Sequence, residues 1–393
     1  MVNPRFDNGF AQLYQADARS LPIPDASIDC VVTSPPYWGL RDYGLDNGIG
    51  LEATPEDFCA NMVKVFREVW RVLKPTGTVW LNLGDSYAHS GQAGGQNNGM
   101  PKDSVYYEGY RSPRYSHQHM SNTAISGIKP KDLLGMPWRV AFALQADGWY
   151  LRSDIIWSKP NPMPESVTDR PTKAHEYVFL LTKSPRYYYD ADAIREPDRD
   201  WGIGKPKNGK YQNAGTGLTT RGGLDNIGRT ESGRNKRTVW EITTQPYPEA
   251  HFATYPEKLV EPCILAGTSE KGVCAVCGKP WERMVELTEE YVALLNSGKA
   301  WRDNEGKPDA YTNRHPTKHP QNVPPKHNTI GWQPTCECNA DTIPATVLDP
   351  FAGSGTTLAV AQRLGRRAIG TDLKAEYLDL ASKRLGSVSL PLF

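Results

Sequence analysis

A glycine-rich segment, DPFAGSGTT at residues 349–357, constrains the fold of this chain more than any other feature. It joins a short predicted strand to a predicted helix, and Gly353 and Gly355 would let the backbone approach a ligand closely. A dinucleotide fingerprint would need another glycine where Leu358 stands, and the Gly-Lys pair of a phosphate-binding P-loop is missing. Asp372 closes the next predicted strand, where an acid binds ribose hydroxyls in nucleotide-binding α/β folds. The pattern therefore favours adenosine without a phosphate over a turn that serves only helix packing.

Short apolar runs alternate with helical repeats along much of the chain, which is typical of an α/β fold with a parallel sheet. The run IDCVVT at residues 28–33 is apolar and β-branched, and it stops at a proline pair. A capped helix is expected to begin after Thr54 and to end at Pro75 and Gly77. Further strands are predicted at residues 78–83, 154–158, 176–182, 346–349 and 367–372, and further helices around residues 138–146, after the glycine-rich segment and at the end of the chain.

The motif TSPPYW follows the first of these strands, with Ser34, Pro35, Pro36 and Tyr37 at the strand's carboxyl end. A lone Pro-Pro match could be an ordinary turn. Together with DPFAGSGTT, however, it resembles the active-site motif of the S-adenosylmethionine-dependent DNA amino-methyltransferases, in which Ser, Asp or Asn precedes Pro-Pro and an aromatic residue. TSPPYW comes before the glycine-rich segment, and this order resembles the permuted beta arrangement of that family.

The resemblance extends over most of the chain, and it implies a doubly wound, seven-stranded Rossmann-like methyltransferase sheet that binds S-adenosylmethionine. The segment ADARSLPIPDASID resembles the family segment in which an acid, here Asp17, contacts adenosine. The segment HFATYPEKLVEPCI resembles the one that lines the methionine end of the cofactor, with Lys258 matching. The cofactor-binding residues predicted in this way are Asp17, Lys258, Asp349, Phe351, Gly353, Ser354, Gly355, Thr356 and Asp372.

The TSPPYW motif suits methylation of an exocyclic base amine, whose lone pair is delocalised into the ring. The Ser34 hydroxyl and the Pro35 carbonyl can accept the amine hydrogens and help turn the lone pair towards the methyl donor. Proline rigidity fixes these carbonyls, and Tyr37 offers a face on which a base extruded from the duplex can stack. Methylation of a ring carbon would need a Pro-Cys motif, and neither Cys30 nor Cys59 follows a proline.

The choice of base follows from the first residue of the motif. Within the family, Ser is more often associated with N4-cytosine, and Asp or Asn with N6-adenine; a short hydroxyl also suits the smaller pyrimidine. The prediction is a site-specific N4-cytosine DNA methyltransferase, with N6-adenine as the alternative. The other interpretations are an inactive DNA-binding protein on the same scaffold, an NAD-dependent oxidoreductase and an enzyme that acts on RNA.

Four cysteines form two close pairs, Cys274 with Cys277 and Cys336 with Cys338. Such paired spacing indicates zinc, and four thiolates close a tetrahedral structural site without an open catalytic position. Residues 274–338 are therefore expected to form an insert that zinc staples at its base. Unliganded reduced thiols and redox chemistry are the alternatives.

Basic side chains outnumber acidic ones in the glycine-rich stretch at residues 195–237. We expect target recognition there, because arginines contact phosphates and guanine edges; a solvated face without a partner is the alternative. The predicted organisation is a catalytic half of the core at residues 1–190 with a long loop at 86–129, a recognition region at 191–245, a cofactor-lining segment at 246–273, the cysteine-bracketed insert at 274–338 and a cofactor-binding half at 339–393.

The bulk properties limit the partners. The formal net charge of +1 confines any nucleic-acid surface to a local patch. The chain shows no secretory leader and no apolar run of about 18 residues, so we expect a cytoplasmic protein of a prokaryote or its phage, without membrane contact. The family resemblance implies double-stranded DNA as the substrate and a companion restriction endonuclease as a further partner. We expect a monomer or a homodimer.

Overall fold

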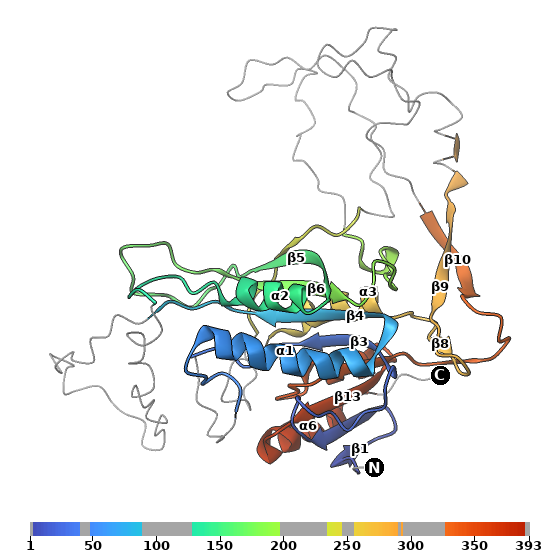
Figure 1. The fold of residues 1–393 in the computed structure, drawn as a ribbon. Coiled ribbons are helices and arrows are strands. Elements are labelled where there is room, and N and C mark those ends of the chain that lie inside the picture. The colour runs from blue at the N-terminus through green and yellow to red at the C-terminus, as the bar shows by residue number, and fades with distance from the viewer. Residues whose placement is uncertain are drawn as a thin grey trace, which may run out of the picture.

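The computed structural model describes residues 3–39, 48–88, 128–196, 234–245, 255–289, 292–293 and 327–389. The strands of its main sheet are β1 (Phe6–Asp7), β2 (Ala11–Gln15), β3 (Ile28–Thr33), β4 (Leu73–Leu83), β5 (Tyr150–Ser158), β6 (His175–Thr182), β7 (Val239–Glu241), β12 (Thr346–Asp349) and β13 (Arg367–Asp372). They lie in the order β1-β2-β13-β12-β3-β4-β6-β5-β7 (Figure 1). Neighbours from β2 to β4 are parallel, whereas β6 runs antiparallel to both β4 and β5.

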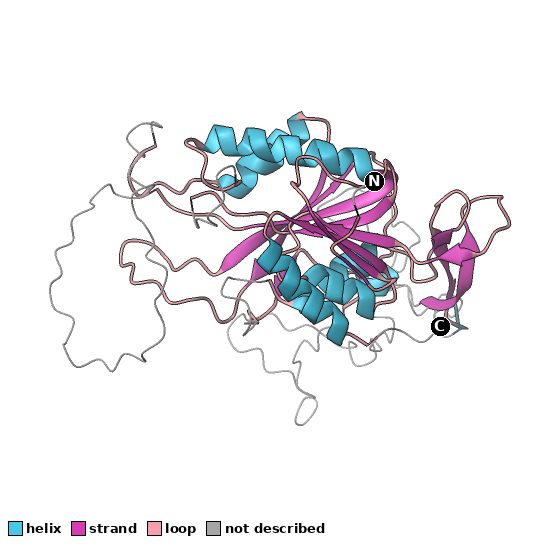
Figure 2. Ribbon diagram, turned by 90° about the horizontal axis from the view of Figure 1, so that it is seen from below, coloured by secondary structure: helices cyan, strands magenta, loops and turns pink. Residues whose placement is uncertain are grey.

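Helices cover both faces of this sheet, as Figure 2 shows. They are α1 (Pro55–Val72), α2 (Met136–Ala146), α3 (Glu257–Gly267), α5 (Thr356–Arg363) and α6 (Ala375–Ser387), with a short 3₁₀ turn at Asp192–Ile194. Helices α1 and α2 pack with Val31 and Phe179 on one face, and α3, α5 and α6 pack with Leu13 and Trp80 on the other. This is the three-layer arrangement of a doubly wound α/β fold.

The central strand β3 is buried along its whole length, because β12 and β4 flank it and helices cover both of its faces. The strands predicted at residues 28–33, 346–349 and 367–372 are confirmed at these bounds. Short segments with β-branched or apolar residues, bounded by turn residues, are typical of buried parallel strands, and this is the signal that predicted them.

Helix α1 begins where the sequence predicts. The Thr54 side chain accepts the backbone N–H of Asp57 and caps the helix, and Pro55 occupies its first turn. The helix ends at Val72, before Pro75, because the chain enters β4 directly at Leu73.

The prediction of seven strands is wrong for the part of the chain that the structure describes. Seven longer strands are joined at the two edges by β1, which has two residues, and β7, which has three. Segments this short have no periodic pattern, and tertiary pairing alone defines them. Strand β7 pairs with β5, so the core sheet includes part of the segment expected to recognise the target.

A second, smaller unit contains two antiparallel pairs, β8 (Val273–Cys274) with β11 (Thr342–Ile343) and β9 (Trp281–Leu287) with β10 (His327–Pro334). The β9–β10 hairpin projects away from the sheet (Figure 1). Most of the long loop, recognition region and insert interior predicted from the sequence, residues 89–127, 197–233 and 294–326, lies outside the described residues. None of the described helices has both the length and the apolar character needed to cross a bilayer.

Candidate active site

A cavity of about 980 Å³ opens at the edge of the sheet where β2, β3, β12 and β13 end. In an open α/β sheet this carboxyl edge is where ligands bind. Its wall includes most of the predicted catalytic and cofactor-binding residues: Asp17, Ser34, Pro35, Pro36, Tyr37, Phe351, Gly353, Ser354, Thr356 and Asp372. The fold thus brings motifs from opposite ends of the sequence to one site.

Tyr37 connects the loop after β3 to a polar network. Its hydroxyl donates to Glu176 Oε2 at 2.7 Å and lies 3.3 Å from Ser34 Oγ. Its ring packs so closely on Gly84 that a Cβ there would lie 2.6 Å from Tyr37 Cε2. Asn82 Oδ1, at 3.2 Å, is a second acceptor for the Tyr37 hydroxyl, so the one hydrogen of this hydroxyl is directed at Glu176 and Asn82. Ser34 Oγ can therefore donate to the Tyr37 oxygen and keep its lone pairs for another donor.

Three further polar residues of the cavity wall were not singled out from the sequence. Asn82 Nδ2 donates to Glu176 Oε2 and to the Tyr177 carbonyl, both at 3.1 Å, and Lys159 forms a salt bridge with Glu176. Asn82, Lys159 and Glu176 all line the cavity. No motif marks them, because the antiparallel pairing of β6 with β4 and β5 brings them together.

Asp349 is buried behind the cavity wall and is only 1% exposed. Its carboxylate accepts from Thr33 Oγ1 at 2.7 Å, from the Tyr255 hydroxyl at 2.8 Å and from the Phe351 N–H at 3.1 Å. Burial raises the pKa of the Asp349 carboxyl, and these hydrogen bonds oppose the shift. Asp349 therefore joins β3, the glycine-rich turn and the segment before α3.

The two glycines of the turn differ in their surroundings. Gly353, with φ of 49°, lines the cavity, and its N–H donates to Asp372 Oδ2 at 3.0 Å. Gly355, with φ of 76°, caps α5, and a Cβ there would lie 3.0 Å from the Cβ of Ala381 in α6. Gly355 therefore serves helix packing, whereas the Gly353 backbone borders the space for a ligand.

Two carboxylates of the cavity wall differ in acidity. Burial raises the pKa of Asp372 to about 6, although the N–H groups of Lys374 and Gly353 donate to it. The side-chain hydrogen bonds of Arg19, one of them 2.6 Å long, lower the pKa of Asp17. Asp17 is therefore ionised at neutral pH, and Asp372 titrates just below neutrality.

The segment expected at the methionine end of the cofactor reaches the cavity through another residue. Lys258 is exposed in the first turn of α3 and is not part of the cavity wall. Tyr255 lines the cavity instead, and its hydroxyl is hydrogen-bonded to both Asp349 and Thr357.

One Pro-Cys pair does occur in the chain, Pro262 with Cys263, but it lies inside α3. Cys263 is 1% exposed, and burial raises the pKa of its thiol well above the usual value. No cysteine among the described residues lines the cavity. Pro262 and Cys263 therefore do not form the nucleophile motif of ring-carbon methylation.

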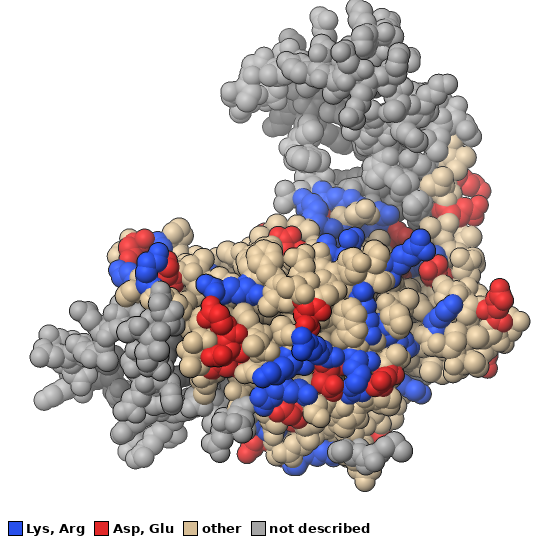
Figure 3. Space-filling view, in the orientation of Figure 1, with Lys and Arg blue, Asp and Glu red and all other residues tan. Residues whose placement is uncertain are grey.

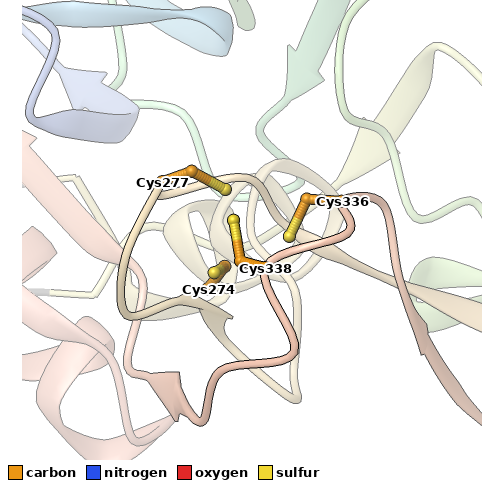
Figure 4. A group of neighbouring side chains, drawn as sticks. All are labelled: Cys274, Cys277, Cys336 and Cys338. Carbon is orange, nitrogen blue, oxygen red and sulfur yellow. The ribbon is translucent and has the colours of Figure 1, made fainter.

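The four cysteines predicted to bind metal lie together, with their sulfur atoms within 4.8 Å of one another (Figure 4). They belong to the unit formed by β8 and β11 and its neighbouring turns. We call residues 274–278 the cysteine knuckle. Lys74 Nζ donates to the Gly278 carbonyl at 3.1 Å and to Asp29 Oδ1 at 2.7 Å, so it joins the knuckle to the amino ends of β3 and β4.

Charged side chains of both signs are interspersed on the face drawn in Figure 3. At the described margins of the predicted recognition region, Arg234 and Arg237 both pair with Glu196 Oε1, at 3.0 and 2.5 Å. These two arginines are therefore engaged within the protein.

Comparison with known proteins identifies relatives. Residues 28–275 and 283–383 match the N6/N4 family model described as DNA methylase. The chain is 37% identical over 381 residues to the type II methyltransferase M.Cfr9I of Citrobacter freundii, an alignment that covers 95% of this chain and 87% of that protein. It is 38% identical over 358 residues to M.SmaI of Serratia marcescens, covering 91% and 84%. The solved structure of PvuII DNA methyltransferase, described as cytosine-N4-specific, shares the fold with a TM-score of 0.50 at 16% identity, covering 98% of this chain and 89% of that chain.

The bonding of Asp349 leads to a prediction for stability. Tyr255→Phe removes one donor from a buried carboxylate, and we expect the free energy of unfolding to fall by about 1–3 kcal/mol at neutral pH. The Asp349 pKa is already raised in the folded state and should rise further, so the loss should shrink as the pH falls towards the unfolded value near 4. Urea unfolding between about pH 5 and 8 measures this, with the exposed Tyr150→Phe as the control. A loss that is independent of pH would contradict this assignment.

Proposed function

The chain belongs to the S-adenosylmethionine-dependent DNA amino-methyltransferases, and on this premise we propose that it methylates N4 of a cytosine rotated out of the DNA duplex. The observation that carries the proposal is the position of two motifs on one cavity. The loop Ser34–Tyr37 and the glycine-rich turn line the same space, and Thr33 and Asp349, next to them in sequence, are hydrogen-bonded to each other. At about 980 Å³ the cavity lies at the upper end of the size range of ligand pockets, which suits a cofactor and a base together.

The network around Tyr37 supports a role for Ser34 as an acceptor. Glu176 takes the Tyr37 hydrogen, and the Ser34 hydroxyl can then point its own hydrogen at the Tyr37 oxygen. The free lone pairs of Ser34, with the Pro35 carbonyl, would accept the two hydrogens of an exocyclic amine. Holding both hydrogens turns the nitrogen lone pair out of the ring plane and makes the amine a better nucleophile.

The cofactor, when bound, supplies an electrophilic methyl group on a sulfonium. Bound in the cavity, S-adenosylmethionine would give this methyl group to the amine nitrogen and leave as the thioether S-adenosylhomocysteine, and the proton released from the amine would pass to solvent. The contribution of the protein is orientation, because in-line displacement needs the acceptor and the donor to be aligned. We assign the donor side of the cavity to Asp17, Phe351, Gly353, Ser354, Thr356 and Asp372, with Asp372 on the ribose hydroxyls.

The choice of N4-cytosine rests on the identity of Ser34 and on the fold shared with the PvuII enzyme. A hydroxyl reaches less far than the carboxylate or amide that family members more often use for adenine, and the PvuII enzyme that shares the fold is described as cytosine-N4-specific. N6-adenine would use the same acceptors and is the second candidate. The type II designation of M.Cfr9I and M.SmaI supports a companion restriction endonuclease as a partner.

We also propose that Cys274, Cys277, Cys336 and Cys338 hold a structural zinc ion. Four sulfur atoms within 4.8 Å of one another match the donor set and the compactness of a tetrahedral site. The segments 191–245 and 274–338 are proposed to serve target recognition and to form a zinc-stapled insert. The described part of the first segment supplies β7 to the sheet, and the described part of the second contains the cysteine knuckle.

The central test of this function is product analysis. The protein is incubated with S-adenosylmethionine and mixed duplex DNA, and digested nucleosides are examined by mass spectrometry. We expect N4-methylcytosine, and a rate lowered by roughly 10- to 100-fold for Ser34→Ala, since an acceptor for the reacting amine is lost. The exposed Ser387→Ala is the matched control. N6-methyladenine as the product would overturn the choice of base, and cofactor binding without any product would favour an inactive scaffold.

The pKa of Asp372 predicts a pH-dependent affinity for the cofactor. Only the ionised carboxylate can accept from two ribose hydroxyls, so binding should weaken as the pH falls through about 6. Calorimetry should give an affinity about tenfold lower near pH 5 than near pH 7.5. Asp372→Asn should bind weakly at both pH values, whereas Asp17, with its lowered pKa, stays ionised over this range. An equal affinity of the parent protein at both pH values would remove Asp372 from the ribose site.

Metal analysis tests the zinc proposal. Protein purified without chelators should contain about one zinc per chain, and Cys277→Ser or Cys336→Ser should lose most of it. Cys59→Ser, outside the cluster, should keep the metal content of the parent protein. Absence of zinc from the parent, with no uptake on addition of zinc, would favour unliganded thiols.

A further inference from the structure

The loop after β5 places an unusually exposed apolar side chain beside the active site. Met163 is 86% exposed, the highest value among the large apolar residues that the structure describes. Single exposed apolar residues are common on protein surfaces and need no explanation by themselves. Met163 differs in its position, because it belongs to the wall of the same cavity as Ser34 and Tyr37.

The loop that carries Met163 is fixed at both ends. Asn161 Nδ2 donates to Thr244 Oγ1 and the Thr244 N–H donates to Asn161 Oδ1, both at 3.0 Å. On the other side, Glu165 accepts from Arg170 Nη1 at 2.6 Å and from the Lys173 N–H at 3.4 Å.

Between these two anchors, Pro162 and Pro164 restrict the backbone on either side of Met163. The side chain is therefore presented to solvent by a backbone with little freedom.

The proposed reaction creates a need for such a residue. Rotating a base out of the duplex breaks its pairing and stacking and leaves a gap in the helix. Proteins that unstack DNA fill such gaps with apolar wedges, methionine among them. The methionine side chain is unbranched and polarisable, so it adapts to the faces of the flanking bases.

We propose that Met163 enters the base stack of the duplex at the position that the target base leaves. The inference rests on the proposed function, since it requires a base to be delivered to the cavity. Burial of Met163 between bases would stabilise the extruded state while the Ser34–Tyr37 loop receives the base. Its role would be to support extrusion and not methyl transfer itself.

The test compares two duplexes built around a site that the parent protein methylates in plasmid DNA. In one duplex the target base is paired, and in the other it lies opposite an abasic site, so that no base pair has to be broken. Single-turnover methylation by Met163→Ala should be slower than that of the parent on the order of tenfold to hundredfold on the paired duplex. On the abasic duplex the variant should approach the parent rate.

Two further variants sharpen the result. Met163→Leu keeps an apolar wedge and should retain most of the rate on paired DNA. Ile330→Ala removes another exposed apolar side chain, one that does not line the cavity, and should behave as the parent.

The outcomes separate this inference from the proposed function. A parent protein that methylates neither duplex contradicts the proposed function. A parent that methylates both, with Met163→Ala equal to it on paired DNA, overturns the wedge alone. A Met163→Ala variant slowed equally on both duplexes would also overturn it, because the defect would then lie in catalysis or folding.

Discussion

A buried carboxylate holds the cavity together. Asp349 has almost no exposure, and an unpaired charge at such a position would be costly, so its donors must remain in place. These donors come from three segments: Thr33 precedes the Ser34–Tyr37 loop, Tyr255 precedes α3, and the Phe351 N–H belongs to the glycine-rich turn. Satisfying one carboxylate therefore fixes the proposed acceptor loop against the proposed cofactor turn. In the proposed reaction, the alignment that methyl transfer needs would thus be built into the core.

The sheet determines which other side chains reach this site. Strands β2, β3, β12 and β13 are parallel, so the loops that follow them meet at one edge. Strand β6 is reversed, and its first residues, including Glu176, come to the same edge. A carboxylate there accepts the Tyr37 hydrogen and pairs with Lys159, which keeps its charge compensated. The reversed strand thus supplies the carboxylate that accepts from Tyr37, so the Ser34 hydroxyl can donate to the Tyr37 oxygen.

Local sequence predicted the backbone motifs and missed the contacts between them. Buried strands bounded by turn residues, such as Ile28–Thr33, carry their own signal, and so do TSPPYW and the glycine-rich turn. The edge strands β1 and β7 are too short for any pattern, and strand pairing places Glu176. Lys258 matched a family motif, yet the turn of α3 on which it lies leaves it exposed. The sequence predicted that Gly355 lets the backbone approach a ligand. In the structure its missing side chain leaves room for Ala381 of α6, a neighbour that local sequence does not reveal.

The cysteine knuckle bears on the opposite edge of the sheet from the cavity. Lys74 joins the Gly278 carbonyl to Asp29, and the other oxygen of Asp29 accepts the N–H of Thr346 at 2.8 Å. These contacts lie at the amino ends of β3, β4 and β12, whereas the cavity lies at their carboxyl ends. A zinc ion held by the four cysteines would therefore lie at the opposite edge of the sheet from the proposed site of the base, and it would not polarise the base. The zinc ion would instead help to hold the amino ends of the central strands in place, while Asp349 holds β12 to β3 at their carboxyl ends.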